Sequence, residues 1–514
     1  MTIANGFLAH AAARPERPAL VLSGHPEQRC DYAELHRGAH AVARALRATL
    51  GSSPGPGVRI AVLLGSCREL LEIFYGGALA GIPVMVFDPA WSAAELAAIE
   101  QDTPPALLFR VGPAAAAEGA RPGMVIDVDG PGYEDWLRRA GGGRAAPVDD
   151  VDALPEADGS TPFYVAFTSG STGRPKGAVR SHRSWMRSFE RTTAEFGIDA
   201  TDRILLPGSL GHSHFLYGAV HGLHSGAQIH LVPRFDAGAV FDGLDRHAIT
   251  RLYLVPTMFE ALLDHAQRNP GRSFPAVRSL LSVGAKWSPA RRAQAAVLFP
   301  NADAAEFYGA TELSIVSILH GDSDGPRDSV GRPVAGVELS LRSPAGEEVA
   351  PGGTGRVYVR SDMLFSGYVS DQDTGAPDGD GWFTVGDIGR LDEDGYLHLV
   401  GRDKRMLISG GLNVYPEEVE AALQRLDEIA EVAVVGLPDE RWGDLVCAVV
   451  RWRDGAGLSR AEVRDRAAAN LSRQKCPRRV FATDRMPYTS SGKIDHRGLR
   501  GVLLDGRHDI REVL

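Results

Sequence analysis

The first half of the chain alternates short apolar runs with amphipathic helical stretches, and this alternation limits its fold more than any other feature. Residues 59–65 read RIAVLLG, a continuous apolar run, and residues 82–88 read IPVMVFD. Such runs are typical of strands buried on both faces of a sheet. A helical stretch containing Leu70, Leu71 and Phe74 lies between them. This strand–helix–strand order predicts a parallel α/β sheet.

The segments on either side of these runs have different characters. Residues 31–50 keep apolar side chains at helical spacing, which predicts an amphipathic helix. Residues 111–160 are rich in Ala, Gly and Asp, and this composition predicts a loose segment that lies partly on the surface.

The pattern changes in the last third of the chain. From about residue 335, short strand-like runs alternate with Gly turns (GVELSLRS, GRVYVRS, GWFTVGD, GYLHLVG), which predicts a β-rich subdomain. After GRDK at 401–404 a new βαβ-like pattern begins with MLISGGLNV and PEEVEAALQRL. We therefore expect an α/β fold in two domains. Residues 1–402 form a large domain of parallel and mixed sheets with helices and the β-rich subdomain, and residues 403–514 form a small α+β domain.

Composition excludes several classes of protein. A chain of 514 residues exceeds what one hydrophobic core usually serves. A net charge of -10 argues against a general binder of nucleic acid or anionic membranes. The four cysteines are scattered without a CxxC pair, and no signal peptide or run of about 18 apolar residues appears. We expect a cytoplasmic enzyme that does not span a membrane.

One loop is built to bind an anion. Residues 168–177 read TSGSTGRPKG, with three glycines, four hydroxyl side chains and Lys176. The stretch differs from a Walker A loop, because Pro175 precedes the lysine and Gly177 follows it. A strand is expected before it at 163–167 and a helix from about residue 184, so the loop joins this strand to another strand or to a helix. Its free amides and hydroxyls are suited to phosphate. A flexible surface loop is the alternative.

Four further motifs follow in order: FYGATE at 307–312, GWFTVGD at 381–387, GRDKRMLISGGLNVYPEEVE at 401–420 and PYTSSGKIDHRGLR at 487–500. Together with TSGSTGRPKG, they resemble the signatures of the adenylate-forming superfamily, which includes acyl- and aryl-CoA ligases, luciferases and peptide-synthetase adenylation domains. The resemblance covers nearly the whole chain. It implies that a carboxylate attacks MgATP to give an acyl adenylate, that a thiol then displaces AMP, and that a mobile C-terminal lid serves both steps.

The resemblance also assigns roles to residues around the phosphates. The β- and γ-phosphates of ATP would be held by Thr168, Ser169, Gly170, Ser171, Thr172, Gly173 and Lys176. Thr311 would donate to the α-phosphate, and Glu312 would bind Mg²⁺, a cation that prefers oxygen ligands. In the motif Phe307–Tyr308–Gly309, Tyr308 would stack on adenine, with Gly284 and Ala285 on its other side.

The remaining assignments concern the ribose and the lid. Asp387 would accept hydrogen bonds from the ribose hydroxyls, and Arg402 would contact the ribose or a phosphate. Lys493 would be the catalytic lysine that stabilises charge at the forming bond, and Lys404 would be the hinge. Gly410 and Gly411 would border the thiol tunnel.

Five histidines lie between residues 211 and 230, and two interpretations are open. A metal site could use the HxH and HxxH spacings, but no nearby cysteine pair or carboxylate completes a ligand set. By resemblance, His212 flanks the carboxylate of the acid substrate and takes part in catalysis. We expect packing or surface roles for His214, His221, His224 and His230.

The same region narrows the substrate. Adenylation domains for α-amino acids place an aspartate here to pair with the substrate ammonium, and GHSHFLYG contains none. An acid without an α-amino group is therefore favoured. Val283 stands where many relatives have glycine, and it would narrow the acyl tunnel against very long chains.

These observations predict an AMP-forming acid–CoA ligase that uses ATP, Mg²⁺ and coenzyme A on a small-molecule carboxylic acid without an α-amino group. The alternative acceptor is the pantetheine of an acyl carrier protein. A luciferase-like oxygenase and a non-catalytic relative are the other candidates, and intact Lys176, Glu312, Asp387 and Lys493 argue against the latter. We expect a monomer or a homodimer.

Overall fold

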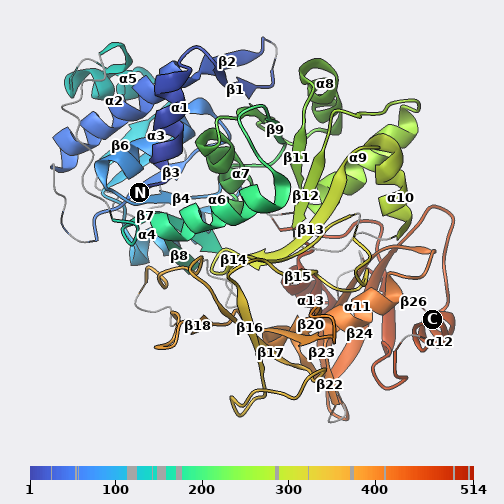
Figure 1. Cartoon of the computed structure of the whole chain (residues 1–514). Helices are drawn as coiled ribbons and strands as arrows, with labels where there is room; N and C mark the ends of the chain where they lie inside the picture. Colours follow the sequence, from blue (N-terminus) through green and yellow to red (C-terminus); the bar gives the residue numbers. More distant parts are fainter. Residues whose placement is uncertain are drawn as a thin grey trace. The chain divides into compact units, whose positions relative to one another are not determined.

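The computed structural model describes the chain except residues 25, 52–54, 56, 113–123, 142, 147–157, 169–175, 284–288, 322, 371–374, 410–411, 470, 490–491, 507–509 and 514. Two compact units are present (Figure 1). Unit 1 comprises Met1–Pro326, Val330–Glu338 and Val359–Phe383; unit 2 comprises Arg327–Ser329, Leu339–Tyr358 and Thr384–Leu514. The domain boundary predicted between residues 402 and 403 stays a prediction. In the described part, no helix combines the length and apolar character needed to cross a membrane.

Unit 1 is built on two sheets. The larger has nine strands in the order β15-β14-β13-β12-β11-β9-β10-β1-β2, and it is parallel from β13 to β1. Its strands are β1 (Pro18–Leu22), β2 (Gln28–Asp31), β9 (Arg203–Leu206), β10 (Gln228–Leu231), β11 (Arg251–Leu254), β12 (Ser279–Val283), β13 (Asp303–Ala310), β14 (Ser314–Leu319) and β15 (Arg332–Pro333).

The second sheet has six strands in the order β6-β5-β3-β4-β7-β8, parallel except for β8 at its edge. Its strands are β3 (Ile60–Leu63), β4 (Val84–Val86), β5 (Leu107–Arg110), β6 (Met124–Asp127), β7 (Pro162–Thr168) and β8 (Lys176–Ser181). The runs at 59–65 and 82–88 are therefore adjacent parallel strands, as predicted. The prediction of a loose segment over 111–160 missed β6 and α5, because both are short and lie within a stretch whose overall composition is rich in Ala, Gly and Asp.

Helices cover both sheets of unit 1. They are α1 (Ala4–Ala13), α2 (Tyr32–Leu50), α3 (Arg68–Ala80), α4 (Ala93–Asp102), α5 (Pro131–Arg139), α6 (His182–Phe196), α7 (Ser213–His224), α8 (Ala237–His247), α9 (Pro256–Arg268) and α10 (Pro289–Leu298), with a 3₁₀ turn at Gly143–Ala145. The predicted helix over 31–50 is α2. It starts at a capping box, in which Asp31 accepts from the backbone of Glu34 and the Glu34 side chain accepts in return.

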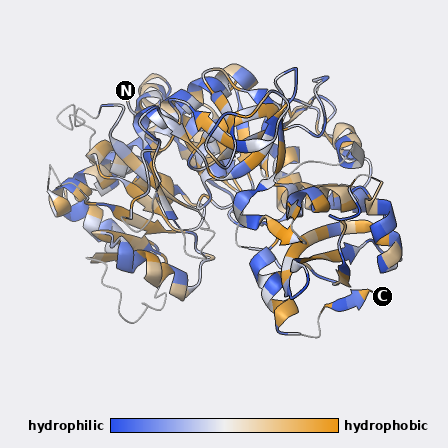
Figure 2. Ribbon diagram, turned by 90° about the horizontal axis from the view of Figure 1, so that it is seen from below, coloured by the Kyte–Doolittle hydropathy of each residue, from blue (hydrophilic) through white to orange (hydrophobic). Residues whose placement is uncertain are grey.

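A shared core lies between these helices and the strands. Phe74 of α3, Tyr164 of β7 and Trp185 of α6 contact one another, with ring centroids 5.3 to 6.1 Å apart. Large aromatic side chains contribute strongly to such cores because each buries a large apolar area. Hydrophobic residues are concentrated on the strands, whereas hydrophilic residues lie on the outer faces of the helices (Figure 2).

Unit 2 contains most of an antiparallel sheet, β16-β17-β19-β20, and a second sheet, β22-β21-β24-β25-β26, with β23 on β24. The short β18 (Trp382–Phe383) pairs with the end of β17. The other elements are β16 (Glu338–Arg342), β17 (Gly355–Arg360), β19 (Asp387–Leu391), β20 (Leu397–Arg402), β21 (Leu407–Ser409), β22 (Leu412–Val414), β23 (Ile429–Asp439), β24 (Gly443–Trp452), β25 (Arg479–Ala482), β26 (Arg511–Val513), a 3₁₀ turn (Asp403–Arg405), α11 (Pro416–Leu423), α12 (Arg460–Ala467) and α13 (His496–Leu504).

Helices pack on both faces of the second sheet of unit 2. Val432 and Val434 of β23 pack in the core that contains α11 and α12 residues. Ala433 and Val435, which alternate with them, pack with Leu499 of α13. The period-two alternation of a strand therefore serves two cores, which explains why residues 432–435 of β23 are apolar without interruption.

His320 generates a prediction about stability. Its Nδ1 lies 2.6 Å from an oxygen of Asp303 at the start of β13, and its Nε2 lies 3.2 Å from Glu195 of α6. The hydrogen bond to Asp303, followed by the charges of both carboxylates, raises the pKa of His320 to about 9. A raised folded-state pKa stabilises the fold fully below the unfolded value near 6.5, and this stabilisation is lost as the pH rises towards 9.

We therefore expect wild-type protein to lose on the order of 2 kcal/mol of unfolding free energy between pH 6 and pH 9.5 relative to His320→Gln. Urea unfolding of both proteins at the two pH values measures the difference. Parallel pH profiles for the two proteins would contradict the assignment.

Candidate active site

The predicted phosphate loop connects two antiparallel strands. Thr168, the last residue of β7, is paired in register with Lys176, the first residue of β8. The predicted ligands between them (Ser169, Gly170, Ser171, Thr172 and Gly173) lie outside the described residues, as do Gly284 and Ala285 on the adenine side. The hairpin therefore fixes the backbone at both ends of the loop.

Lys176 and Glu312, which are 136 positions apart in the sequence, meet at one side chain. The Nζ of Lys176 lies 5.1 Å from the ring centroid of Tyr368, a cation–π arrangement. The hydroxyl of Tyr368 donates to Oε1 of Glu312 at 2.9 Å. Glu312 is buried, at 6% exposure. The tyrosine, which the sequence interpretation missed, thus links two of the predicted ATP-binding motifs.

The backbone around Glu312 is held equally closely. The segment containing Tyr368 pairs with β8, because the amide of Val369 donates to the carbonyl of Gly177 at 2.8 Å. The amide of Phe365 donates to the carbonyl of Glu312 at 2.9 Å. Three distant stretches of unit 1 therefore converge at this carboxylate.

Arg180 of β8 is a second residue that the sequence interpretation missed. Its guanidinium is buried and donates from Nη1 to the carbonyl of Thr311 at 2.6 Å and from Nη2 to the carbonyl of Met363 at 2.7 Å. Burial lowers the pKa of Arg180 to about 10, while the charge of Glu312 opposes this shift. The residue directly before Glu312 is thus fixed by a buried cation.

The predicted adenine and acyl residues lie at the carboxyl ends of neighbouring strands. Val283, the last residue of β12, is paired in register with Phe307 of β13. Tyr308 is buried. A Cβ on Gly309 would lie 2.2 Å from the carbonyl oxygen of Ser314, so only glycine allows the tight turn that carries Thr311. Ser314, just beyond, has φ +62, a strained value for a non-glycine residue.

His212 follows β9 and precedes α7, where it faces a carboxylate that the sequence interpretation did not identify. Its Nε2 lies 3.6 Å from Oδ2 of Asp88, which follows β4. Asp88 is 3% exposed, and its Oδ1 accepts from the amide of Ala90 at 3.0 Å. Its Oδ2 has no hydrogen-bond partner among the residues that the structure describes. The pair joins the two sheets of unit 1.

The other histidines of this segment are packed side chains. The ring of His221 stacks on Phe189 at 4.8 Å, and its Nε2 lies 2.8 Å from the hydroxyl of Thr193. Burial lowers the pKa of His214, His221 and His230 to about 3. Across the described residues, no group of three or more His, Cys, Asp or Glu side chains is arranged to hold a metal ion. These positions fit the prediction that they serve packing.

In unit 2, Asp387 and Arg402 are neighbours. They are paired in register on β19 and β20, and the Nε of Arg402 donates to Oδ1 of Asp387 at 2.8 Å. Asp387 is 3% exposed. Partial desolvation, followed by the charge of Arg402, lowers the pKa of Lys493, and the charge of Asp387 opposes the shift. Three predicted site residues of unit 2 therefore interact electrostatically.

Lys493 lies in a short turn that is closed by backbone contacts. The amide of Thr489 donates to the carbonyl of Lys493 at 2.7 Å, and Tyr488 and Ile494 form an isolated β-bridge. Its side chain reaches solvent, although neighbouring groups partly desolvate the ammonium. The lysine is thus presented by a fixed turn rather than packed into a core.

The base of this lysine motif is anchored to α11. Nε2 of His496 lies 2.9 Å from Oε1 of Glu420, and Nη2 of Arg405 donates to the same oxygen at 2.8 Å. Burial raises the pKa of Glu420, but the His496 and Arg405 contacts outweigh it and leave that pKa below its usual value. The sequence interpretation missed this anchor, which connects the lysine motif to the residue after the predicted hinge.

The hinge and tunnel assignments are described only in part. Lys404 lies in the 3₁₀ turn Asp403–Arg405, directly after β20. Gly410 and Gly411 lie outside the described residues, between the paired strands β21 and β22. Their predicted roles stay predictions.

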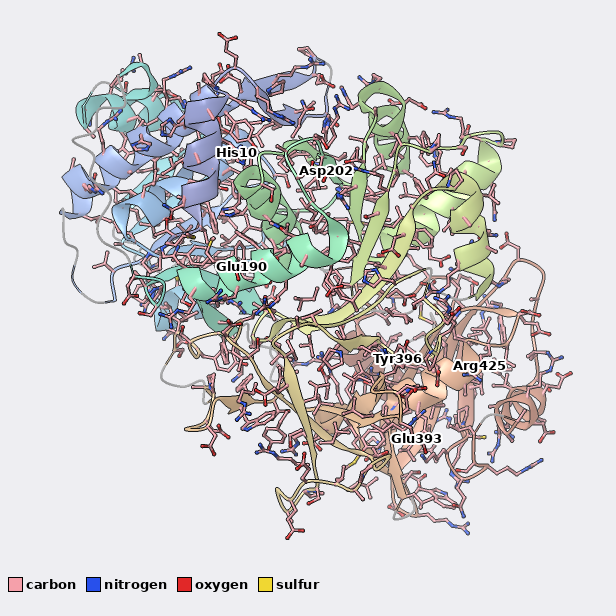
Figure 3. All side chains as sticks on the ribbon, viewed as in Figure 1. His10, Glu190, Asp202, Glu393, Tyr396 and Arg425 are labelled. Carbon is pink, nitrogen blue, oxygen red and sulfur yellow. The ribbon has the colours of Figure 1, made fainter. Side chains whose placement is uncertain are left out.

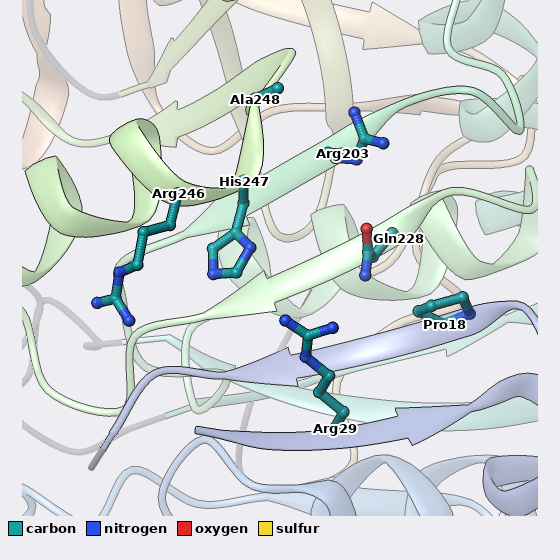
Figure 4. A pocket seen from close by; sticks show the side chains of 7 residues that line it. All are labelled: Pro18, Arg29, Arg203, Gln228, Arg246, His247 and Ala248. Carbon is teal, nitrogen blue, oxygen red and sulfur yellow. The ribbon is translucent and has the colours of Figure 1, made fainter. Parts of the chain in front are cut away.

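A cationic pocket lies at the opposite ends of the parallel strands (Figure 4). Its volume is about 330 Å³, and its lining residues are Pro18, Arg29, Arg203, Gln228, Arg246, His247 and Ala248. Arg203 and Gln228 begin β9 and β10, so the pocket is at the amino ends of these strands. Ligands of open α/β sheets bind at the carboxyl ends, where His212 and Val283 lie. The pocket is therefore separate from the candidate site.

Comparisons with known proteins agree with this geometry. Residues 7–369 match the model of the AMP-binding enzyme family, and residues 418–493 match that of the AMP-binding enzyme C-terminal domain. An uncharacterized acyl–CoA ligase, YhfT, from Bacillus subtilis is 35% identical over 96% of this chain and 97% of its own length. Indoleacetate–CoA ligase from Aromatoleum aromaticum is 32% identical over 96% of each chain.

A solved structure shares the fold over nearly the full length. ATP-bound MatB from Rhodopseudomonas palustris superposes with a TM-score of 0.84 at 26% identity, covering 98% of this chain and 99% of that one. The α/β fold with a large N-terminal part and a smaller C-terminal part is thereby confirmed. The chain belongs to the AMP-binding enzyme family and is an acyl- or aryl-CoA ligase of the adenylate-forming superfamily.

Proposed function

We propose that this protein joins a carboxylic acid lacking an α-amino group to coenzyme A, using ATP and an acyl-adenylate intermediate. The observation that carries the proposal is the partly buried contact of Tyr368 with both Lys176 and Glu312, which unites two predicted ATP-binding motifs. A carboxylate oxygen of the acid attacks the α-phosphorus of ATP, and the bond to the bridging oxygen breaks to release pyrophosphate. The thiol of coenzyme A then attacks the acyl carbon, and AMP leaves.

The residues divide this work between them. Lys176 and the loop before it hold the β- and γ-phosphates, which become the leaving group. Thr311 donates to the α-phosphate, and Asp387 binds the ribose hydroxyls with Arg402 beside it. Lys493 stabilises charge on the oxygens of the forming bond. We infer that residues 403–514 move as a lid about Lys404 between the two half-reactions, since a few junction residues can absorb such a rotation.

Glu312 fits a magnesium ligand. It offers a hard carboxylate whose Oε1 accepts a hydrogen bond from Tyr368. Magnesium usually takes one or two carboxylates, with substrate phosphates and water completing its octahedron. A bound magnesium ion would neutralise part of the triphosphate charge. The other residues of the site bind and orient the nucleotide.

The acyl side favours an acid of modest length. His212 flanks the acid carboxylate, and Val283 narrows the acyl tunnel beyond it. Relatives named for indoleacetate and ferulate, the latter 32% identical over 90% of this chain, support aryl or short acids. Four described cysteines without disulfides support a reducing, cytoplasmic location.

A carrier protein is the second candidate acceptor. The fatty acid–[acyl-carrier-protein] ligase ScoC of Streptomyces coeruleorubidus is 30% identical over 96% of this chain. Both reactions share the adenylation step and differ only in the thiol.

A pyrophosphate-release screen tests the proposal. We expect release with short, branched or aryl acids, a thioester when coenzyme A is added, and weak activity with C16 acids and α-amino acids. Replacing coenzyme A with a phosphopantetheinylated carrier protein separates the two acceptors. Absence of pyrophosphate release with every acid would exclude the ligase.

Replacing Lys493 should separate the half-reactions. We expect Lys493→Ala to slow adenylation by on the order of 100-fold or more, because one preorganised charge at a transition state has an effect of this size. Thioester formation from supplied acyl adenylate should stay within about threefold of wild type. Lys475→Ala is the matched control, since Lys475 of the same unit pairs with Glu418 at 2.7 Å. Equal loss of both half-reactions would overturn the role of Lys493.

Asp88 should affect binding of the acid substrate through its contact with His212. We expect Asp88→Asn to raise KM for the acid by about tenfold, the effect of one charged contact, and to leave KM for MgATP unchanged. In the background of His212→Gln, Asp88→Asn should have little further effect, because the coupling is then already absent. Additive effects of the two substitutions on KM would disprove the coupling.

A further inference from the structure

Arg180 is a buried cation that the reaction scheme above does not use. It lies on β8, and its residue is 1% exposed. Lys176, Ala178 and Arg180 share one face of this strand, since side chains alternate along it. The face that carries the predicted phosphate-binding lysine therefore also carries a second positive charge, four residues further into the fold.

The guanidinium joins two segments of the candidate site. Its two terminal nitrogens donate to the carbonyls of Thr311 and Met363, at 2.6 and 2.7 Å. Its Nε has no hydrogen-bond partner among the described residues. Met363 begins the stretch that leads to Phe365, whose amide donates to Glu312, and to Tyr368, whose hydroxyl donates to the Glu312 carboxylate. Arg180 thus holds the Glu312 backbone from one side and the segment that orients its carboxylate from the other.

A purely structural role would not require a charge here. Both hydrogen-bond acceptors of Arg180 are neutral carbonyls, and a buried arginine pays a large desolvation cost that an apolar residue avoids. The carboxylate that acts on Arg180 electrostatically is Glu312, itself 6% exposed. A buried carboxylate is costly unless an opposite charge or donor offsets it. The cation accordingly matches the charge of Glu312 as well as the position of Thr311.

We propose that Arg180 is a positioning residue for MgATP: it fixes the Thr311 carbonyl and, through its charge and the Met363 segment, holds the Glu312 carboxylate ready for the nucleotide-bound metal. The inference rests on the proposed function, because it assigns Thr311 and Glu312 to ATP. It adds a residue outside the family motifs to the set that determines nucleotide affinity.

Another buried arginine of unit 1 offers a matched control. Arg251 is 3% exposed and donates to Asp202 at 2.8 Å, to Ser279 at 2.7 Å and to the carbonyl of Gly197 at 3.0 Å. It begins β11, at the amino ends of the strands near Asp202 (labelled in Figure 3). Its loss should destabilise the fold as severely as that of Arg180, without altering the nucleotide site.

The experiment compares Arg180→Met, Arg180→Lys and Arg251→Met with wild-type protein. Calorimetry measures MgATP binding without acid, pyrophosphate release gives KM for MgATP and for the acid, and thermal unfolding gives Tm. We expect Arg180→Met to weaken MgATP binding by ten- to hundredfold, the range for hydrogen bonds to charged groups, and to change KM for the acid by less than about threefold. Arg180→Lys keeps the charge but cannot span both carbonyls. Its affinity for MgATP should therefore lie between those of wild-type protein and Arg180→Met.

The outcomes are distinct. Arg251→Met should lower Tm and leave MgATP affinity within about twofold of wild type. If Arg180→Met lowers Tm but binds MgATP as wild type does, Arg180 is only structural and the proposal is overturned. If Arg180→Met does not fold, Arg180→Lys and Glu312→Gln decide instead. If both of these variants bind MgATP as tightly as wild-type protein, the proposal is overturned as well. Failure of the proposed function has a different signature, because wild-type protein itself would then not bind MgATP.

Discussion

The burial of the Glu312 carboxylate constrains the architecture of unit 1 more than any other interaction. A carboxylate at 6% exposure is tolerated only when nearby donors and charges offset its desolvation. The offset comes from Tyr368 and from Arg180, on two elements distant in the sequence. The edge position of β8 makes this possible, since one side of the strand pairs with β7 and the other with the segment 366–369. The segment 366–369 thereby covers the edge of the sheet and also places Tyr368 against the Glu312 carboxylate.

The sequence predicted the regular part of this fold well. Continuous apolar runs at 59–65 and 82–88 are parallel strands, and the 31–50 pattern is α2, because strand burial and helical periodicity are local properties. The loop at 168–177 was expected to leave a strand, but local pattern could not show that it returns as an antiparallel neighbour of the same strand. The elements β6 and α5 were missed because both are short and lie in a stretch whose overall composition is rich in Ala, Gly and Asp.

The site residues show the same difference between what local sequence predicts and what only the folded chain shows. Motif resemblance predicted the residues for nucleotide contact, and their roles stay predictions. It could not identify Tyr368, Arg180 or Asp88, because each acts on a residue between 56 and 131 positions away in the chain. Glu420 and His496, which are 76 positions apart, are a comparable pair in unit 2. Single-sequence periodicity carries no information about such pairings, and the chemistry of each residue alone is compatible with an ordinary surface role.

The two units hold their charges in physically different ways. In unit 1 the cation Arg180 is bound by backbone carbonyls inside a core, so its position is as fixed as the sheet itself. Lys493 of unit 2 is exposed, and only the backbone of its turn is tied, through Thr489. A buried guanidinium suits a group that must define geometry before substrate arrives, because it has no alternative position to occupy. An exposed lysine on a rigid turn suits a group that approaches and leaves, since moving it breaks no internal contact of a core. The degree of burial therefore matches the role proposed for each residue, which is fixed binding for Arg180 and transient catalysis for Lys493.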